Sequence, residues 1–257
     1  MVAVITELPL FVFTTFAGLS AGAYASAAFF PPKSRREKSE RPWTLHAACL
    51  VLLAIGMLGS LMHLGHPERM LNAFSNPLAP ITLEGYLSSA FGLVVLADAV
   101  INITKGRSVR PLMIVGGLLS IALVCVMGWA YFTCFGIPAW NLTYTLPFFI
   151  AGSIAAGMGM TAVIDNSLMT GKPFFFAFAI LQAIFGASII ALSVHFSNLG
   201  ESWGLLGIGL AIGPIASTVI SAVGIAGKKP PSRIAVIAFA LAFIGMAVAR
   251  YGFYMAA

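Results

Sequence analysis

The sequence consists of long hydrophobic runs that are separated by short segments rich in proline, glycine and charged residues. A helix needs roughly 20 apolar residues to cross the hydrocarbon core of a bilayer, and each run is about that long. The strands of a membrane β-barrel would alternate polar and apolar residues, and these runs do not. The pattern predicts an all-α integral membrane protein with eight transmembrane helices, at about residues 8–30, 43–65, 82–104, 111–135, 143–167, 173–196, 203–226 and 233–255.

The composition separates the chain from soluble proteins. Hydrophobic residues make up 60% of its 257 residues and charged residues 9%, whereas soluble domains are about 45–50% apolar and about 25% charged. Glu7 precedes the first run, and neither a basic start nor a clear cleavage site accompanies it, so we interpret this run as a helix rather than a signal peptide. The connecting segments are too short for a further domain. Residues 1–257 are therefore predicted to form a single polytopic membrane domain.

Lysine and arginine are distributed very unevenly between the two sides of the predicted bundle. Twelve of the 14 lie in the first, third, fifth and seventh connecting segments, which include PPKSRREKSERP and GKKPPSR. Only Arg69 and Arg250 fall on the other side. The positive-inside rule then places the odd-numbered segments in the cytoplasm and both termini outside. The net charge of +6 is thus a topology signal, and nucleic-acid binding is not expected.

Ionisable residues collect where the second run ends, in the stretch GSLMHLGHPERML. This stretch contains His63, His66, Glu68 and Arg69, and Glu84 begins the third run on the same predicted side. Ionisable groups at membrane depth are costly and usually functional. A histidine can accept or release a proton near neutral pH. Because oxidation of a quinol releases protons together with electrons, His63 is a candidate proton acceptor for such chemistry.

Each candidate also has a purely structural interpretation. His63 could cap its helix by bonding free carbonyl groups, and Arg69 could be an interfacial anchor. The helix dipole alone would favour Glu84 in a first turn, although a proton relay from His63 through Glu84 to water is the sharper hypothesis. Arg250 could extend toward the interface, or it could line a cavity together with Tyr254, which follows it at the i+4 helical spacing.

Other polar residues carry less specific information. His195 could belong to the site or merely end a helix, and we favour the second interpretation. His46, Asp98 and Asp165 lie on the opposite side, where they could cap helices or help to pack the bundle. The three cysteines lie in apolar runs, and an iron–sulfur cluster normally needs four. Haem would need two ligands on facing helices, a condition that His63 and His195 meet only weakly, so no haem or metal is expected in this protein.

Four pieces of the sequence form a familiar pattern. The first run begins with ELPLFVFTTFAGLSAGAY, the second ends with GSLMHLGHPERMLNAFSN, the third holds the LEG around Glu84, and the last ends with RYGFYM. Together they resemble the membrane anchor subunit of bacterial dimethyl sulfoxide (DMSO) reductases, a family of eight-helix proteins with outside termini. The stretch from about 110 to 235 matches only as apolar helices.

The resemblance implies a function. It implies an inner (cytoplasmic) membrane protein without haem or metal, which binds a quinol, typically menaquinol, on the side where an iron–sulfur subunit docks. Electrons would pass to that subunit and then to a molybdopterin catalytic subunit. The protein would therefore serve a quinol-dependent oxidoreductase without holding its catalytic centre. The terminal electron acceptor is not implied, because related anchors serve reductases for several acceptors.

The resemblance also implies the residues of the site. The family's quinol-site histidine, glycine and arginine fall on His63, Gly65 and Arg69, and its acidic residue falls on Glu84. Our hypothesis is that quinol enters between the outer halves of the helices, that His63 takes a proton, and that Glu84 passes it outward. Arg69 and Arg250 would then help to bind the quinol or to hold the site.

Other classes of protein stay open at this stage. A pure membrane tether would use the outer polar residues only as docking contacts. A secondary transporter would have a midplane site with broken helices, to which the runs GIGLAIGPIAS and AGSIAAGMGM give slight support, although glycine is common in membrane helix packing. A proton-pumping subunit would need carboxylates at the midplane, and Asp98 and Asp165 lie too close to the inner ends.

Overall fold

The computed structural model describes residues 2–32, 43–63, 72, 75–106 and 108–256, with only the backbone described for 2–6 and His63. These residues form α1 (Val2–Phe29), α2 (Thr44–His63), α3 (Pro80–Lys105), α4 (Arg110–Phe132), α5 (Thr145–Ile164), the short 3₁₀ helix η2 (Leu168–Thr170), α6 (Lys172–Leu199), α7 (Gly204–Leu210), the π-helical η3 (Ala211–Ser217), α8 (Thr218–Ala226) and α9 (Pro231–Tyr254). Within this described part, eight segments are long and apolar enough to cross a membrane, with α7 to α8 forming one of them. The predicted all-α membrane class and the predicted number of spans are confirmed.

The largest difference from the predicted boundaries is at the first helix. α1 begins at Val2 rather than near residue 8, and it continues through Pro9. A proline lacks the N–H that would bond four residues back, but near a helix start this loss affects only the first turns. The residues before Glu7 are VAVIT, so the apolar sequence of the first helix continues on both sides of this single acid.

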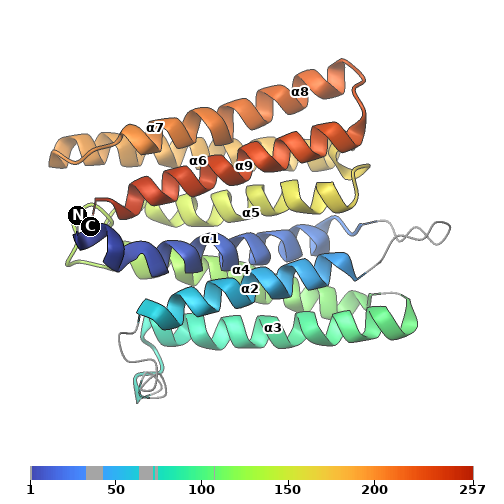
Figure 1. Cartoon of the computed structure of the whole chain (residues 1–257), viewed down its shortest axis with the longest axis horizontal. Helices are drawn as coiled ribbons and strands as arrows, with labels where there is room; N and C mark the ends of the chain where they lie inside the picture. Colours follow the sequence, from blue (N-terminus) through green and yellow to red (C-terminus); the bar gives the residue numbers. More distant parts are fainter. Residues whose placement is uncertain (1, 33–42, 64–71, 73–74, 107, 257) are drawn as a thin grey trace.

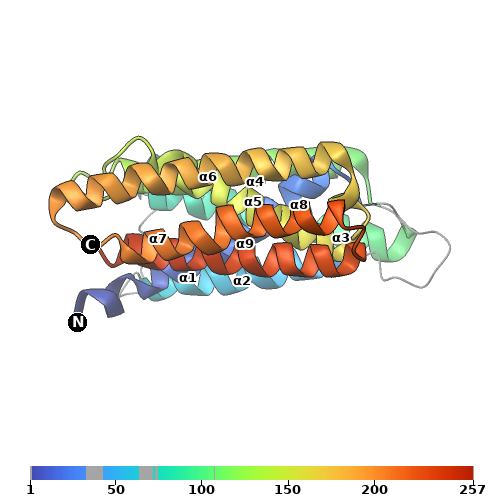
Figure 2. The same ribbon diagram turned by 90° about the horizontal axis from the view of Figure 1, so that it is seen from above.

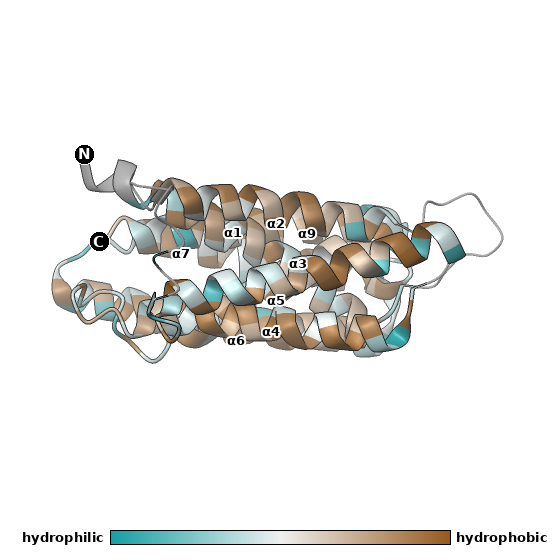
Figure 3. Cartoon of the chain, turned by 90° about the horizontal axis from the view of Figure 1, so that it is seen from below, coloured by the Kyte–Doolittle hydropathy of each residue, from teal (hydrophilic) through white to brown (hydrophobic). Residues whose placement is uncertain are grey.

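The helices run side by side along an elongated bundle, and both termini lie at one end of it (Figures 1 and 2). We call this the terminal end. The opposite end, which we call the basic end, carries the connections that contain Lys105, Arg110, Lys172, Lys228 and Lys229. Hydrophobic residues cover the sides of the bundle, and hydrophilic residues are found mainly toward its two ends (Figure 3). That the terminal end faces the outside stays a prediction from the charge asymmetry.

α1 and α5 lie in the centre of the bundle. α1 contacts α2, α4, α5 and α9, and α5 contacts α1, α2, α4, α6 and α9. Small residues allow the two helices to cross closely. A Cβ atom at Gly22 would lie 2.0 Å from the carbonyl oxygen of Ser153, and one at Gly157 would lie 2.1 Å from the backbone of Gly22 and Ala23. Thr161 donates a hydrogen bond to the Ala23 carbonyl at 3.0 Å. Close contact between small residues is a common way for membrane helices to associate.

This crossing gives a stability prediction. Gly22→Ala is expected to destabilise the protein by about 1–3 kcal/mol, because the added methyl group must push the backbones of α1 and α5 apart. Thermal unfolding of the detergent-solubilised protein measures the effect. Gly85→Ala is the matched control, since a Cβ at this helical position of α3 meets nothing within 4 Å. Equal melting temperatures for the two variants would contradict the prediction.

The seventh span is interrupted by the π-helical η3. This segment contains Pro214, whose missing N–H and bulky ring do not fit a regular α-helix. Gln182 of α6 donates a hydrogen bond to Ser217 Oγ at 3.0 Å. A Cβ at Gly245 of α9 would lie 2.2 Å from the backbone of Gly213. The run GIGLAIGPIAS gave slight support to the hypothesis of a transporter. In the structure, its Gly213 allows close contact between η3 and α9.

Candidate functional site

A buried carboxyl group lies at the terminal end of the bundle. Glu84 is in the second turn of α3 and is 8% exposed. Its Oε1 atom is fully buried and has no hydrogen-bond partner. An unpartnered polar atom in an apolar interior is costly, and an ionisable group at membrane depth usually has a function. Glu84 therefore has free capacity to bind a hydrogen-bond donor or a proton.

Two tyrosines lie near this carboxyl group. Tyr131 from α4 and Tyr254 from α9 are both buried, and each interacts electrostatically with Glu84. Their rings pack edge to face, with centroids 5.4 Å apart. The Tyr254 hydroxyl is also 3.1 Å from Thr14 Oγ1 on α1. Polar side chains from four spans thus gather at the terminal end. We call these residues the terminal-end polar cluster: Thr14, Glu84, Tyr131 and Tyr254.

Aromatic rings enclose this cluster. Tyr131 stacks on Phe149 with ring centroids 4.8 Å apart, and Trp140 stacks on Phe253 at 5.5 Å. The Trp140 indole N–H donates to the carbonyl of Phe253 at 3.1 Å, so the connection between α4 and α5 is fastened over the end of α9. Polar groups surrounded by packed rings are shielded from water, and their mutual interactions are correspondingly stronger.

Arg250 is completely buried and does not extend to the interface. Its guanidinium donates hydrogen bonds to the Thr14 carbonyl, to the Phe149 carbonyl at 3.1 Å and to Ser153 Oγ at 2.7 Å. It also lies over the Phe149 ring, 4.9 Å from the centroid. Gly18 leaves room for it, because a Cβ there would lie 3.0 Å from Nη1. Arg250 therefore joins α9 to α1 and α5, and its expected role in quinol binding stays a prediction.

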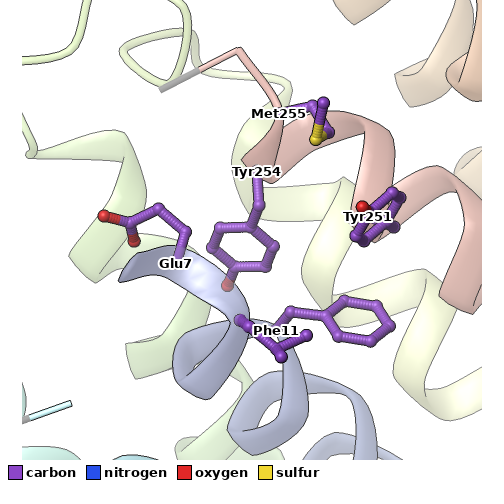
Figure 4. Close-up of a pocket in the computed structure, with 6 residues that line it drawn as sticks. Glu7, Phe11, Tyr251, Tyr254 and Met255 are labelled. Carbon is purple, nitrogen blue, oxygen red and sulfur yellow. The ribbon is translucent and has the colours of Figure 1, made fainter. Parts of the chain in front are cut away.

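A pocket opens beside the cluster, between the start of α1 and the end of α9. It is lined by Glu7, Leu8, Phe11, Tyr251, Tyr254 and Met255. Figure 4 shows the ring of Tyr254 between Glu7 on one side and Tyr251 on the other. Leu8 and Met255 are exposed, whereas Tyr254 is buried. The pocket thus connects the surface of the terminal end with one member of the polar cluster.

The structure describes only part of the site that the sequence predicts. Gly65 and Arg69 lie outside the described residues, as do His66 and Glu68. The backbone of His63 ends α2 at the terminal end, and its side chain is not described. The end of α2 and the start of α3 lie side by side there (Figure 1). The fold thus places His63 and Glu84 at the same end of neighbouring helices.

His195 has a structural contact. Its Nε2 atom lies 3.0 Å from the carbonyl oxygen of Pro138, to which it donates a hydrogen bond. This bond ties α6 to the connection between α4 and α5. His195 lies inside α6, one turn before the helix ends at Leu199. The expectation that it marks a helix end is therefore correct to within one turn.

A second buried polar group lies at the basic end and was not foreseen as a unit. His46 Nε2 lies 2.8 Å from Asp98 Oδ2, and the Tyr24 hydroxyl donates to the same oxygen at 2.9 Å. The backbone N–H of Val109, the N-cap residue of α4, donates to Asp98 Oδ1 at 3.1 Å. We call Tyr24, His46, Asp98 and Val109 the basic-end network. It joins α1, α2, α3 and the start of α4, which confirms the expected packing role of His46 and Asp98.

Comparison with known proteins agrees with this architecture. The model of the family described as DMSO reductase anchor subunit (DmsC) matches residues 1–223, from the first helix into α8. The C subunit of the anaerobic dimethyl sulfoxide reductase of Haemophilus influenzae is 27% identical to this sequence over 199 residues, an alignment that covers 72% of the protein described here and 68% of its relative.

Proposed function

The protein belongs to the family of DMSO reductase anchor subunits (DmsC), and from this membership and the terminal-end geometry we propose that it binds and oxidises a quinol, menaquinol in particular. Each quinol gives up two electrons and two protons. The electrons pass to an iron–sulfur subunit docked at the terminal end and then to a molybdopterin catalytic subunit. The protons leave through side chains of the anchor.

The observation that carries the proposal is the buried, unpartnered carboxyl oxygen of Glu84. A quinol hydroxyl is a hydrogen-bond donor that becomes strongly acidic as its electrons leave, so it needs an acceptor held close to it. The free carboxyl oxygen of Glu84 inside the bundle can accept this hydrogen bond. Glu84 lies in a membrane-embedded layer, where a lipid-soluble quinol can reach it from the bilayer.

The other predicted residues complete the site. His63 precedes the connection that leads to Glu84, and it serves as the second proton acceptor. Gly65 lets the backbone approach the quinol ring closely, and Arg69 binds a quinol oxygen or holds the docked partner. Arg250 supports the site by fixing α9 against α1 and α5, and its positive charge favours negative charge on the quinol oxygen.

The charge asymmetry gives the reaction a direction across the membrane. With the basic end in the cytoplasm, quinol oxidation at the terminal end releases protons on the outer side. The iron–sulfur and catalytic subunits would dock on the same side. The terminal electron acceptor is left open by this reasoning, because the anchor residues contact the quinol rather than the final substrate.

The decisive experiment compares two electron donors in the purified complex. His63→Ala is expected to lower menaquinol-dependent turnover at least tenfold, as expected for loss of a proton acceptor, while a soluble dye that reduces the partner subunits directly supports normal turnover. His195→Ala is the control. It also removes a histidine from the terminal end, but the Nε2 atom of His195 bonds a loop carbonyl, so turnover with both donors is expected to stay normal.

Other outcomes separate the alternatives. If both activities of the His63→Ala complex are unchanged, the assignment of His63 is wrong. If both fall together, the residue serves assembly, and the protein acts as a tether. If the wild-type complex is active with dye but fails to oxidise any quinol, the proposed function itself is wrong.

A further inference from the structure

We propose that Glu7 is the proton exit of the quinol site, and that Tyr131 and Tyr254 connect it to Glu84. This inference rests on the proposed function, because it assigns the route that the released protons take. Glu7 was not among the residues expected to form the site. It becomes a candidate only through the packing of α1 against α4 and α9.

The position of Glu7 at the terminal end is unusual for a surface carboxylate. Its Oε2 atom is fully buried and has no hydrogen-bond partner. The rest of the side chain is partly exposed and lines the pocket with Leu8, Tyr254 and Met255 (Figure 4). One side of this carboxyl group therefore faces the protein interior while the residue also reaches a surface opening. A group that passes protons from a buried site to water needs both kinds of contact.

The two tyrosines lie between the carboxyl groups. Tyr131 packs edge to face on Tyr254 with ring centroids 5.4 Å apart, and Tyr254 lines the pocket beside Glu7 (Figure 4). The Tyr254 hydroxyl is 3.1 Å from Thr14 Oγ1, and Tyr131 lies within electrostatic range of both Glu84 and Glu7. A tyrosine hydroxyl can accept one hydrogen bond while it donates another. It can therefore transfer a proton from one neighbour to the next without holding a charge for long.

The surroundings favour this direction over others. Packed aromatic rings, among them Phe149, Trp140 and Phe253, cover the cluster toward α5 and the connection above it. Arg250 lies deeper in the bundle, and its positive charge disfavours a proton moving toward it. The pocket between α1 and α9 is the surface opening that borders the cluster in the described part of the protein. The residue that stands at this opening and carries a carboxyl group is Glu7.

Protons and electrons balance along this route. Oxidation of one quinol to quinone releases two electrons, which leave to the docked partner under the proposed function, and two protons. His63 accepts one of the two protons under the proposed function, and Glu84 accepts the other. The proton on Glu84 moves to a tyrosine hydroxyl as that hydroxyl gives its own proton to Glu7. Glu7 then releases the proton to water at the pocket, and both carboxylates are ready for the next proton. No bond other than those to hydrogen is formed or broken along the route.

The test uses the purified complex, with menaquinol and dye turnover measured in parallel. Glu7→Gln keeps the size of the side chain but cannot accept a proton, so menaquinol turnover is expected to fall about tenfold with dye turnover unchanged. Tyr131→Phe removes only the hydroxyl and is expected to have a similar effect. Because both residues act in one route, the double variant should be no slower than the slower single variant.

A rescue experiment distinguishes proton transfer from a structural role. Glu7→Ala, which leaves space where the carboxyl group stood, is expected to show the same loss as Glu7→Gln. Acetate, a small diffusible proton acceptor, is expected to restore menaquinol turnover in Glu7→Ala but not in Tyr131→Phe, because the buried Tyr131→Phe change leaves almost no space for a solute. Glu201→Gln is the matched control: it removes an exposed carboxyl group from the same end and is expected to change neither activity.

The outcomes are separable from those of the proposed function. If wild-type turnover with menaquinol is normal and Glu7→Gln matches it, the exit route is wrong while the quinol site stands. If Glu7→Gln lowers dye turnover equally, or if its effect multiplies with that of Tyr131→Phe, the route is also wrong. If the wild-type complex itself does not oxidise menaquinol, the proposed function fails first.

Discussion

Replacing Glu84 by glutamine is expected to lower menaquinol-dependent turnover by roughly a hundredfold or more, the range typical of a lost general acid or base. Glutamine has nearly the same size as glutamate, so the packing of α3 is preserved. It can no longer accept the proton that leaves the quinol hydroxyl. The turnover of the complex with a soluble dye is expected to stay unchanged, because the dye bypasses the membrane subunit.

The stability of this variant is an independent measurement. The carboxyl group of Glu84 is buried with an unpartnered oxygen, and a neutral amide is less costly to bury than a carboxylate. Glu84→Gln should therefore melt at the same temperature as the wild type or higher. An inactive variant of normal or raised stability indicates a functional carboxyl group. Loss of stability together with loss of both activities would instead show that Glu84 serves only the fold.

Asp98→Ala is expected to destabilise the protein by about 3–5 kcal/mol, as for breakage of other buried charge pairs. The substitution removes the acceptor for His46, Tyr24 and the Val109 N–H at once. Each donor is left buried without its partner, and the start of α4 loses its tie to α3. The fall in stability can be measured as reduced resistance of the solubilised protein to heat or denaturant.

Two comparisons make this prediction specific. Asp98→Asn keeps the shape of the side chain and one acceptor oxygen, so it is expected to lose clearly less stability. Asp165→Ala removes an aspartate at the same end that bonds Ser167 of its own loop, and its loss should also be smaller. The apparent affinity for menaquinol should not change in Asp98→Ala, since the network lies at the opposite end from the proposed quinol site. A small effect of Asp98→Ala would show that water replaces the lost partner.

The sequence predicts the membrane class and the spans well, because both depend on composition and length. It did not predict that α1 extends to Val2, because the charged Glu7 suggests a boundary although the apolar residues VAVIT precede it. The sequence also could not show how each helix is rotated about its own axis, and hence which of its faces points into the bundle. Apolar residues lie on every face of these helices, so the hydrophobic pattern does not reveal which side is buried.

The same limit applies to the site. Glu84 could be singled out from sequence because an acid at membrane depth is rare. Tyr131 could not, since a tyrosine near a helix end is equally typical of an interfacial aromatic belt. The basic-end network brings together residues from three helices, and only the helix rotations reveal that His46 and Asp98 face one another. Asp98 was expected either to cap a helix or to help pack the bundle, and the second role is the one observed: its Oδ1 atom accepts a hydrogen bond from the backbone N–H of Val109, just before α4.

The free oxygen of Glu84 also bears on ligand affinity. A buried acceptor that lacks a donor costs about 1–3 kcal/mol, and a ligand that supplies the donor recovers this cost on binding. Since about 1.4 kcal/mol corresponds to a tenfold change in a dissociation constant, the proposed function implies that reduced quinol binds roughly five- to 150-fold more tightly than an oxidised quinone, which has no hydroxyl to offer. A protein that oxidises quinol at this position would discriminate between substrate and product by a hydrogen bond that only the substrate can complete. That difference would help the product to leave after each turnover.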